Sequence, residues 1–317
     1  MNFFAPLVGQ NQAVELLTQA VRQNRIAPAY LFTGPDGVGR SLAAKCFVAQ
    51  VFCAGVPAHQ QPQVQHRLQL DNHPDLLWVE PTHLHQGQRL SAAEAVTAGL
   101  KRKAPPLIRL EQIREIVQFL SRPPLEAPRN VVVLEQAETM AEAAANALLK
   151  TLEEPGQATL ILLAPSIESL LPTLVSRCQR IPFHRLNLEG MAQVLQQTGH
   201  AELRLSPEVL GIAQGSPGEA NASWKQLENI PADLLKAVEA PPKSLKDALE
   251  TARQIDKMDT AAQLWLVDYL QHRYWRQFLT GAIRRSPLQQ LEQARKSLLC
   301  YAQPRLVWEC TLLEMCQ

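Results

Sequence analysis

The stretch that decides the fold reads Ala29-Tyr-Leu-Phe-Thr-Gly-Pro-Asp-Gly-Val-Gly-Arg-Ser41. Its first four residues predict a short buried strand, a glycine-rich turn follows, and a helical pattern continues to Cys53. In loops of this kind, backbone N–H groups surround phosphates at the N-terminus of the following helix. The order strand, loop, helix therefore predicts an α/β domain with a phosphate loop.

The loop departs from the full motif G-x-x-x-x-G-K-[ST] at one position. Arg40 replaces the lysine that reaches the β- and γ-phosphates, whereas Ser41 keeps the hydroxyl that holds Mg²⁺. Arginine is longer, planar and forked, so the two cations are not interchangeable at a tight site. Two readings stay open, a glycine turn that only shapes the fold and a degenerate nucleotide site, whose residues would be Gly34, Gly37, Gly39, Arg40 and Ser41.

A second nucleotide motif should be an apolar strand that ends in two acids, one for Mg²⁺ and one for the attacking water. The strand at 131–134 ends instead in Glu135-Gln136. The expected aspartate is lengthened to Glu135, and the amide of Gln136 cannot accept a proton. Both changes predict that the chain requires no cofactor and does not hydrolyse ATP, with binding of ATP and Mg²⁺ as the alternative.

The remaining pattern alternates strands with helices, which predicts a parallel sheet covered on both faces. Thr139 and Glu142 form a possible capping box for a helix that Pro155 ends. After about residue 185 only helical patterns remain. The expected strands are 29–32, 76–79, 130–134 and 159–164. The expected helices of this part are 10–22, 40–53, 110–120 and 142–154. A loop is expected at 54–72 and an inserted surface segment at 82–106.

Composition narrows the function classes. The 317 residues carry 31 Lys and Arg against 30 Asp and Glu, a net charge of +1. This balance excludes a chain that holds nucleic acid by charge alone. The sequence shows no secretory signal, no membrane-length apolar run and no CxxC pair, which predicts a reduced, cytoplasmic protein without membrane contact. No metal is predicted; the weaker alternative to plain loop histidines is a zinc site from Cys53, His59, His66 and His73.

Three further motifs follow the phosphate loop in order. They are His73-Pro-Asp75, Asn146-Ala-Leu-Leu-Lys-Thr-Leu-Glu-Glu-Pro155 and Pro172-Thr-Leu-Val-Ser-Arg-Cys178. Together these four motifs, over residues 1–185, resemble the AAA+ clamp loaders of bacterial DNA polymerase III. The resemblance implies an AAA+ P-loop domain at 1–185, a small helical lid at 186–228 and an all-α collar domain for oligomerisation at 229–317, although the C-terminal half matches only in being helical and of suitable length.

The departures from the family indicate which kind of subunit this is. Its ATPase subunit has a P-loop lysine, Asp-Glu after the strand and an arginine in the lid, where this chain has Arg40, Glu135-Gln136 and Gly218. Arg177 is kept. The resemblance therefore implies a subunit that does not hydrolyse ATP but gives an arginine finger, Arg177 flanked by Ser176 and Cys178, to a neighbour in trans. The rival interpretation of Arg177 is a local ion pair at a helix end.

The implied function is that of a non-catalytic subunit of the DNA-directed DNA polymerase complex, which helps to load the sliding clamp onto primed DNA. Its implied partners are the loader's ATPase subunits and delta, the clamp, and primed DNA through the complex. The alternative is an active AAA+ ATPase, either the loader's motor subunit or a related P-loop ATPase. Four aromatic residues at approximately helical spacing, Trp265, Tyr269, Trp275 and Phe278, favour packing or subunit contact over nucleic-acid binding.

Overall fold

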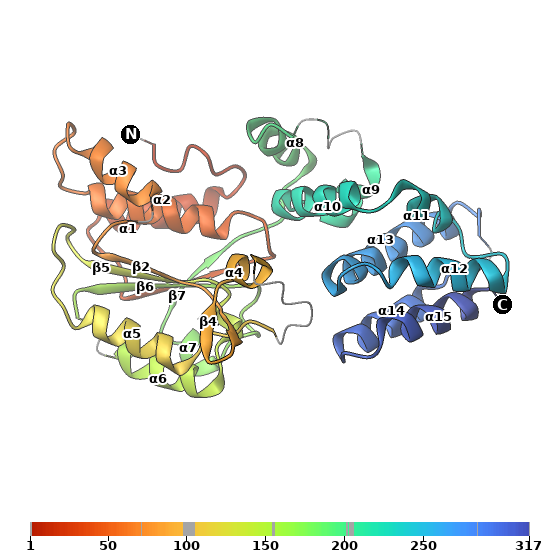
Figure 1. Cartoon of the computed structure of the whole chain (residues 1–317). Coiled ribbons are helices and arrows are strands. Elements are labelled where there is room, and N and C mark those ends of the chain that lie inside the picture. Colours follow the sequence, from red (N-terminus) through yellow and green to blue (C-terminus); the bar gives the residue numbers. More distant parts are fainter. Residues whose placement is uncertain are drawn as a thin grey trace. The chain divides into compact units, whose positions relative to one another are not determined.

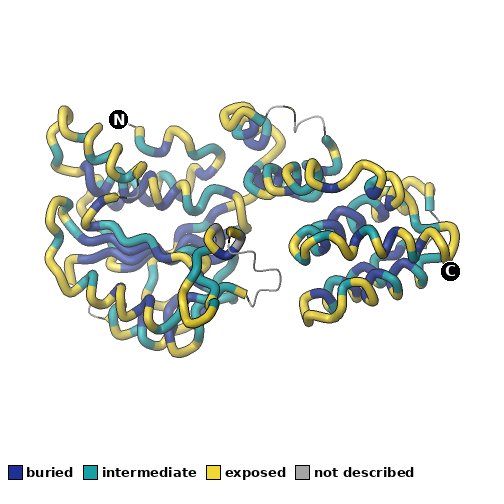
Figure 2. Tube along the Cα trace, in the orientation of Figure 1, coloured by how far each residue is buried: buried dark blue, intermediate teal, exposed yellow. Residues whose placement is uncertain are grey.

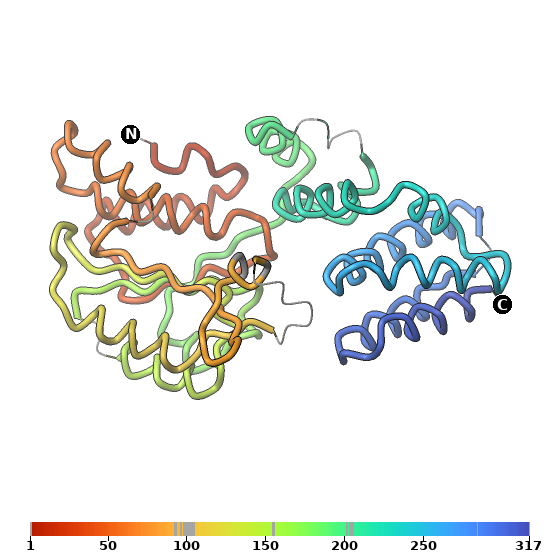
Figure 3. Tube along the Cα trace, viewed as in Figure 1, coloured from red at the N-terminus to blue at the C-terminus, as the bar shows by residue number. Residues whose placement is uncertain are grey.

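The computed structural model describes residues 2–70, 72–97, 105–153, 156–200, 202, 206–283 and 285–316. The chain forms two compact units, Met1–Gly190 and Met191–Gln317, and Figure 3 traces its path through both. The finer boundaries at 185 and 228 remain predictions.

The first unit is built on a five-stranded sheet in the order β2-β5-β6-β1-β7. Every pairing in it is parallel. Four of these strands confirm the sequence expectation, and the strand next to β1 at the sheet edge was not predicted. The strands are β1 (Ala29–Thr33), β2 (Leu76–Val79), β5 (Asn130–Leu134), β6 (Ala158–Ala164) and β7 (Gln179–Pro182).

Helices cover both faces of this sheet (Figure 1). Because side chains alternate along a strand, Phe32 packs with the helices of one face and Leu31 with those of the other. All residues of β1, β5 and β6 are buried, so the predicted α/β fold is confirmed. One face carries α1 (Asn11–Arg22), α2 (Arg40–Cys53) and α3 (Gln61–Gln69); the other carries α5 (Leu110–Leu120), α6 (Glu142–Glu153) and α7 (Pro172–Val175).

Two local expectations, the loop at 54–72 and the capping box, were wrong. The predicted loop at 54–72 contains α3, whose two apolar side chains, Val64 and Leu68, are only partly buried against the core and are too few to mark a helix in the sequence. The inserted segment lies at the surface over residues 83–90, as expected, and contains β3 (His83–His85), β4 (Gln88–Leu90) and α4 (Ala92–Thr97), with the β3–β4 turn made by residues of positive φ. Thr139 does not cap α6, because its hydroxyl donates to the Gln136 carbonyl within η1 (Ala137–Thr139). Pro155 and 98–104 lie outside the described residues.

The second unit is helical throughout its described residues, as expected. Trp308 lies fully buried at the centre of its core, where its indole N–H donates to the Gln263 side chain at 2.9 Å. Figure 2 shows each helix buried along one side and exposed along the other. The helices are α8 (Leu188–Gln197), α9 (Pro207–Ala213), α10 (Pro217–Asn229), α11 (Ala232–Ala237), α12 (Leu245–Ile255), α13 (Thr260–Leu279), α14 (Leu288–Leu299) and α15 (Pro304–Met315).

Four of the five aromatic residues of α13 form two stacked pairs, and the fifth, Tyr274, is fully buried. Trp265 and Tyr269 stack at 5.4 Å between ring centroids, and Tyr269 is buried, which agrees with a packing role. Trp275 and Phe278 also stack, but they are 43% and 38% exposed. In the described part of the chain, no helix is both long and apolar enough to cross a membrane.

Candidate functional site

The phosphate loop follows β1 at the carboxyl end of the sheet, in a turn that only glycine fits. A Cβ on Gly34 would lie 2.4 Å from the Phe183 carbonyl oxygen, and one on Gly39 would lie 2.8 Å from the Leu7 side chain. Gly39 also has a φ of 104° at the start of α2, and Gly37 a φ of 72°. The loop therefore has the close backbone packing that its glycines predict.

The buried amide of Gln10 fastens this loop to two other segments. Its nitrogen donates to the carbonyls of Val38 at 3.2 Å and of His184 at 2.7 Å, and its oxygen accepts the His184 N–H at 3.0 Å. Gln10 is only 3% exposed. Sequence reasoning missed this residue, because a single glutamine before a helix carries no recognisable signal.

Arg40 stands where the motif's lysine would, at the first residue of α2, but it turns toward the loop itself. Its guanidinium forms an ion pair with Asp36 of the same loop. The Arg40 side chain is 10% exposed, and its buried Nη1 atom finds no hydrogen-bond partner in the described part of the chain. The one cation at the key position is therefore already engaged with a carboxylate.

Carboxylates gather around this loop. Burial, together with the nearby Glu80, raises the pKa of Glu135, although a hydrogen bond with Ser41 and the charges of Arg40 and Lys45 oppose the rise. Burial likewise raises the pKa of Glu138, assisted by Asp36 and Glu135 and opposed by Arg40. The structure thus brings the degenerate P-loop and Glu135 together, as predicted, in a surrounding that disfavours further negative charge.

Gln136 follows Glu135 at the position of the second acid. It is exposed and has a left-handed φ of 48°. Its carbonyl accepts the Thr139 N–H at 2.8 Å, which forms the turn into η1. An amide side chain at this turn can orient a water molecule but cannot remove its proton.

Arg177 lies in another place, between α7 and β7. Its Nη1 atom donates to the Thr173 carbonyl at 3.0 Å and its Nη2 atom to the Glu153 carboxylate at 2.8 Å. Ser176 is exposed and donates to the same carbonyl, while burial raises the pKa of the Cys178 thiol to about 11. The ion pair of the rival interpretation is therefore present, and the Arg177 side chain remains 37% exposed with it.

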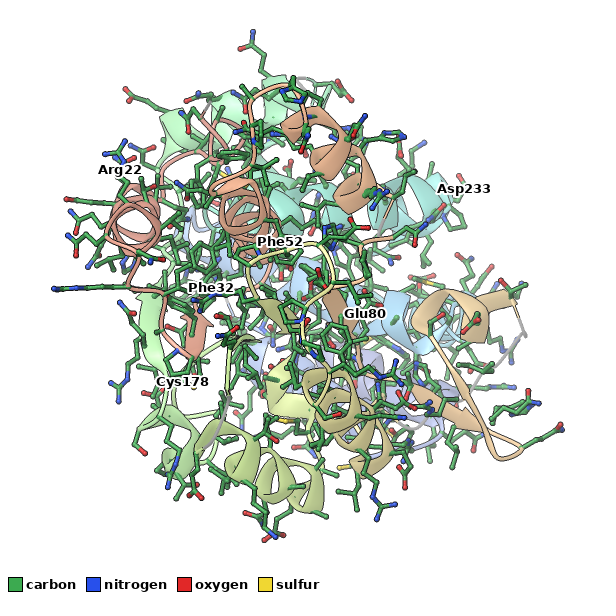
Figure 4. All side chains as sticks on the ribbon, turned by 90° about the vertical axis from the view of Figure 1, so that its left-hand side faces the viewer. Arg22, Phe32, Phe52, Glu80, Cys178 and Asp233 are labelled. Carbon is green, nitrogen blue, oxygen red and sulfur yellow. The ribbon has the colours of Figure 1, made fainter. Side chains whose placement is uncertain are left out.

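The polarity of the sheet separates Arg177 from the loop of its own chain. Gln179 at the start of β7 lies level with Tyr30, and Gly34 comes four residues after Tyr30. Four residues of parallel strand span about 13 Å at roughly 3.3 Å per residue. Figure 4 shows Cys178, beside Arg177, and Glu80, after β2, at opposite edges of the sheet. Arg177 and the P-loop are thus two separate parts of the molecule.

The His73-Pro-Asp75 motif has a structural task that the sequence did not reveal. The buried Asp75 carboxylate accepts three backbone N–H groups, from Leu125 at 2.7 Å, Glu126 at 2.8 Å and Ala127 at 2.7 Å. His73 packs against Phe52 with ring centroids 4.5 Å apart, and burial lowers its pKa.

The structure gives the alternative zinc site no support. Cys53 is buried, with its pKa raised by burial, and His73 is packed against a phenyl ring. Within the described ranges, no group of three His, Cys, Asp or Glu side chains is placed to hold a metal ion.

Comparison with known proteins covers nearly the whole chain. The family model "DNA polymerase III, delta subunit" matches residues 9–187, and "Cyanobacterial DNA polymerase III delta prime, C-terminal domain" matches residues 189–315. A solved DNA polymerase III gamma-subunit-related protein from Thermotoga maritima covers 96% of this chain and 98% of its own, at 20% identity and a TM-score of 0.49.

Two curated relatives carry the same subunit name. DNA polymerase III subunit delta' of Pseudomonas aeruginosa is 30% identical over 77% of this chain and 69% of its own length. The subunit delta' of Bacillus subtilis is 31% identical over 56% of this chain and 48% of its own length, so the match spans about half of that relative. Taken with the two domain models and the motif order, these relatives show that the chain belongs to the delta-prime family of bacterial DNA polymerase III subunits.

Proposed function

We propose that this protein is a clamp-loader subunit that does not hydrolyse ATP itself and supplies Arg177 to a nucleotide held by a neighbouring subunit. An arginine finger stabilises the charge that develops on the transferred phosphoryl group, an effect worth about 10³–10⁵ in rate. The single observation that carries the proposal is the position of Arg177. It is partly exposed at the amino end of the sheet, away from its own P-loop, so it can reach a nucleotide only in another chain.

The surroundings of the loop support the lack of hydrolysis. Arg40 is paired with Asp36, and Glu135 and Glu138 already have raised pKa values before any phosphate enters. Gln136 supplies no base. In the second unit, Gly218 occupies the first turn of α10, where the ATPase subunits that the chain resembles carry an arginine.

Under this function the P-loop could still bind a nucleotide, but without hydrolysing it. If nucleotide binds without turnover, the backbone of 34–41 would surround its phosphates, and Ser41 with Glu135 would face its Mg²⁺. The proposed partners are the loader's ATPase subunits and delta, the sliding clamp, and primed DNA through the assembled complex. The proposed lid at 186–228 and collar at 229–317 would join the chain to these subunits.

The test is ATP turnover by the loader reconstituted with the full-length chain, in the presence of clamp and primed DNA. Arg177→Ala should remove the turnover of the nucleotide site that this chain serves, so total turnover falls by that site's share or more. Arg180→Ala is the matched control, because Arg180 is also exposed and lies three residues further along, in β7. Unchanged turnover in Arg177→Ala loaders would contradict the proposal.

The alternative function, an active ATPase, is tested on the isolated chain. Binding of a fluorescent ATP analogue followed by a phosphate-release assay should show no hydrolysis above background. Hydrolysis that disappears in Arg40→Ala would establish the alternative instead.

A further inference from the structure

We infer that Glu153 is the positioning residue of the arginine finger, an inference that rests on the proposed function. The Arg177 guanidinium is held by two acceptors from two different helices. One is the Glu153 carboxylate at the last residue of α6, 2.8 Å from Nη2, and the other is the Thr173 carbonyl in α7, 3.0 Å from Nη1. Two fixed contacts define both the position and the plane of the guanidinium.

The remaining donors are available to a nucleotide. A guanidinium has five N–H groups, of which these contacts use two. The side chain is 37% exposed, so the other donors can face a neighbouring subunit. Donors that are already oriented need no rearrangement when charge develops in the transition state, which is the condition for strong electrostatic catalysis.

Glu153 lies in the last described turn of α6, where a carboxylate gains from a positive partner; Lys150 of the same turn is one such charge and Arg177 is the one that contacts Glu153. The carboxyl end of a helix carries partial negative charge, so an acid in this turn is repelled by the helix dipole. The positive charge of Arg177 helps to offset that repulsion. Because the pair is 37% and 55% exposed, it contributes little to folding stability. A contact of this kind is better explained by positioning than by stability.

The inference predicts a specific kinetic effect. Without Glu153 the guanidinium keeps one of its two anchors, and loss of orientation at a reacting centre lowers the rate constant far more than it lowers nucleotide binding. Glu153→Ala should therefore reduce the Arg177-dependent part of loader turnover about tenfold, with the KM for ATP unchanged. Glu153→Gln keeps an acceptor oxygen and should restore most of that turnover.

The experiment compares loaders that contain the unmodified chain, Arg177→Ala, Glu153→Ala, Glu153→Gln and the double variant. Glu142→Ala is the matched control, since Glu142 is an exposed acid at the other end of α6. The expected result is a lower turnover number in Glu153→Ala at constant KM, rescue in Glu153→Gln, and no further loss when Glu153→Ala is added to Arg177→Ala. Because the exposed pair contributes little to folding stability, Glu153→Ala should assemble and melt as the unmodified chain does, and thermal melting checks this before turnover is compared.

The outcomes separate this inference from the proposed function. If Arg177→Ala leaves turnover unchanged, the finger itself is refuted, and the role of Glu153 is refuted with it. If Arg177→Ala lowers turnover but Glu153→Ala does not, the finger stands and the positioning role is overturned. An added loss in the double variant, or an equal loss in Glu142→Ala, would place the effect of Glu153 outside the Arg177 contact and also overturn it.

Discussion

Replacing Asp75 with alanine should destabilise the first unit by about 3–5 kcal/mol. Its carboxylate is 1% exposed and accepts three backbone N–H groups from the segment that enters β5. Hydrogen bonds to a charged group contribute roughly 1.5–3 kcal/mol each, which gives about 4.5–9 kcal/mol for three. The expected loss is smaller, close to the value of about 3–6 kcal/mol for two bonds, because Leu125, one of the three donors, is 78% exposed and its N–H can return to water.

Asp75→Asn should cost less, about 2–3 kcal/mol. The asparagine side chain has the volume of aspartate and keeps one acceptor oxygen. Its NH₂ group, however, must face at least one of the three backbone N–H groups, and that hydrogen bond is lost because both groups are donors. The difference between the two variants therefore measures how much of the stabilisation comes from the carboxylate's acceptor capacity.

The assay is urea unfolding of the full chain followed by tryptophan fluorescence, in which Trp78 reports the first unit and the other four tryptophans, all after residue 190, report the second. Trp78 is the only tryptophan among residues 1–190 and lies in β2, three residues after Asp75. Glu15→Gln, which changes an exposed acid on α1, is the control and should stay within about 0.5 kcal/mol of the unmodified chain. A loss below about 1 kcal/mol in Asp75→Ala would refute the reasoning, because charged hydrogen bonds of this geometry could not then be stabilising.

Three other predictions concern single side chains. Burial raises the pKa of Glu135 above its unfolded value, so the ionised side chain destabilises the fold at neutral pH. Glu135→Gln should therefore raise the melting temperature at pH 7–8. This gain should vanish as the pH falls below the ordinary glutamate pKa, because Glu135 is then protonated in both the folded and the unfolded chain. The Cys178 thiol, with a pKa of about 11, should react with maleimide at pH 7.5 far more slowly than the exposed Cys300, as read by mass spectrometry of the native chain; equal rates would contradict the burial. Trp308→Phe should destabilise the second unit by about 2–3 kcal/mol in calorimetry, because the buried Gln263 oxygen loses its donor; an unchanged transition would exclude that hydrogen bond as a stabilising contact.

The sequence predicted the buried parts of the fold because their pattern is local. The strands β1, β5 and β6 are nearly continuous apolar runs, so each can be predicted from its own residues without knowing which strands pair with it. β7 could not be read in this way, since of its four residues only Ile181 is buried and Gln179 and Arg180 are exposed at the sheet edge. Helix α3 was missed for the same reason.

The residues of the candidate site were predicted, but their partners were not. The motif order placed Glu135 beside the P-loop, and the structure agrees. The pairing of Arg177 with Glu153, or of Asp75 with 125–127, joins residues 24 and at least 50 positions apart. Such contacts depend on the tertiary fold and on side-chain rotamers, which no local pattern in one sequence records.

The P-loop and Arg177, the proposed finger, lie toward opposite ends of the sheet, so the first unit has two different ends. An assembly that brings the finger end of one chain to the loop end of the next is a head-to-tail series, whose interfaces are heterologous and whose order around a ring has a single sense. Under the proposed function, this chain, whose Arg40 is paired with Asp36, acts in such a series only as a donor. The chain would therefore lie at one end of the series of ATP-hydrolysing subunits. The ring that it joins would then be asymmetric because its subunits differ in sequence, and not only because they differ in conformation.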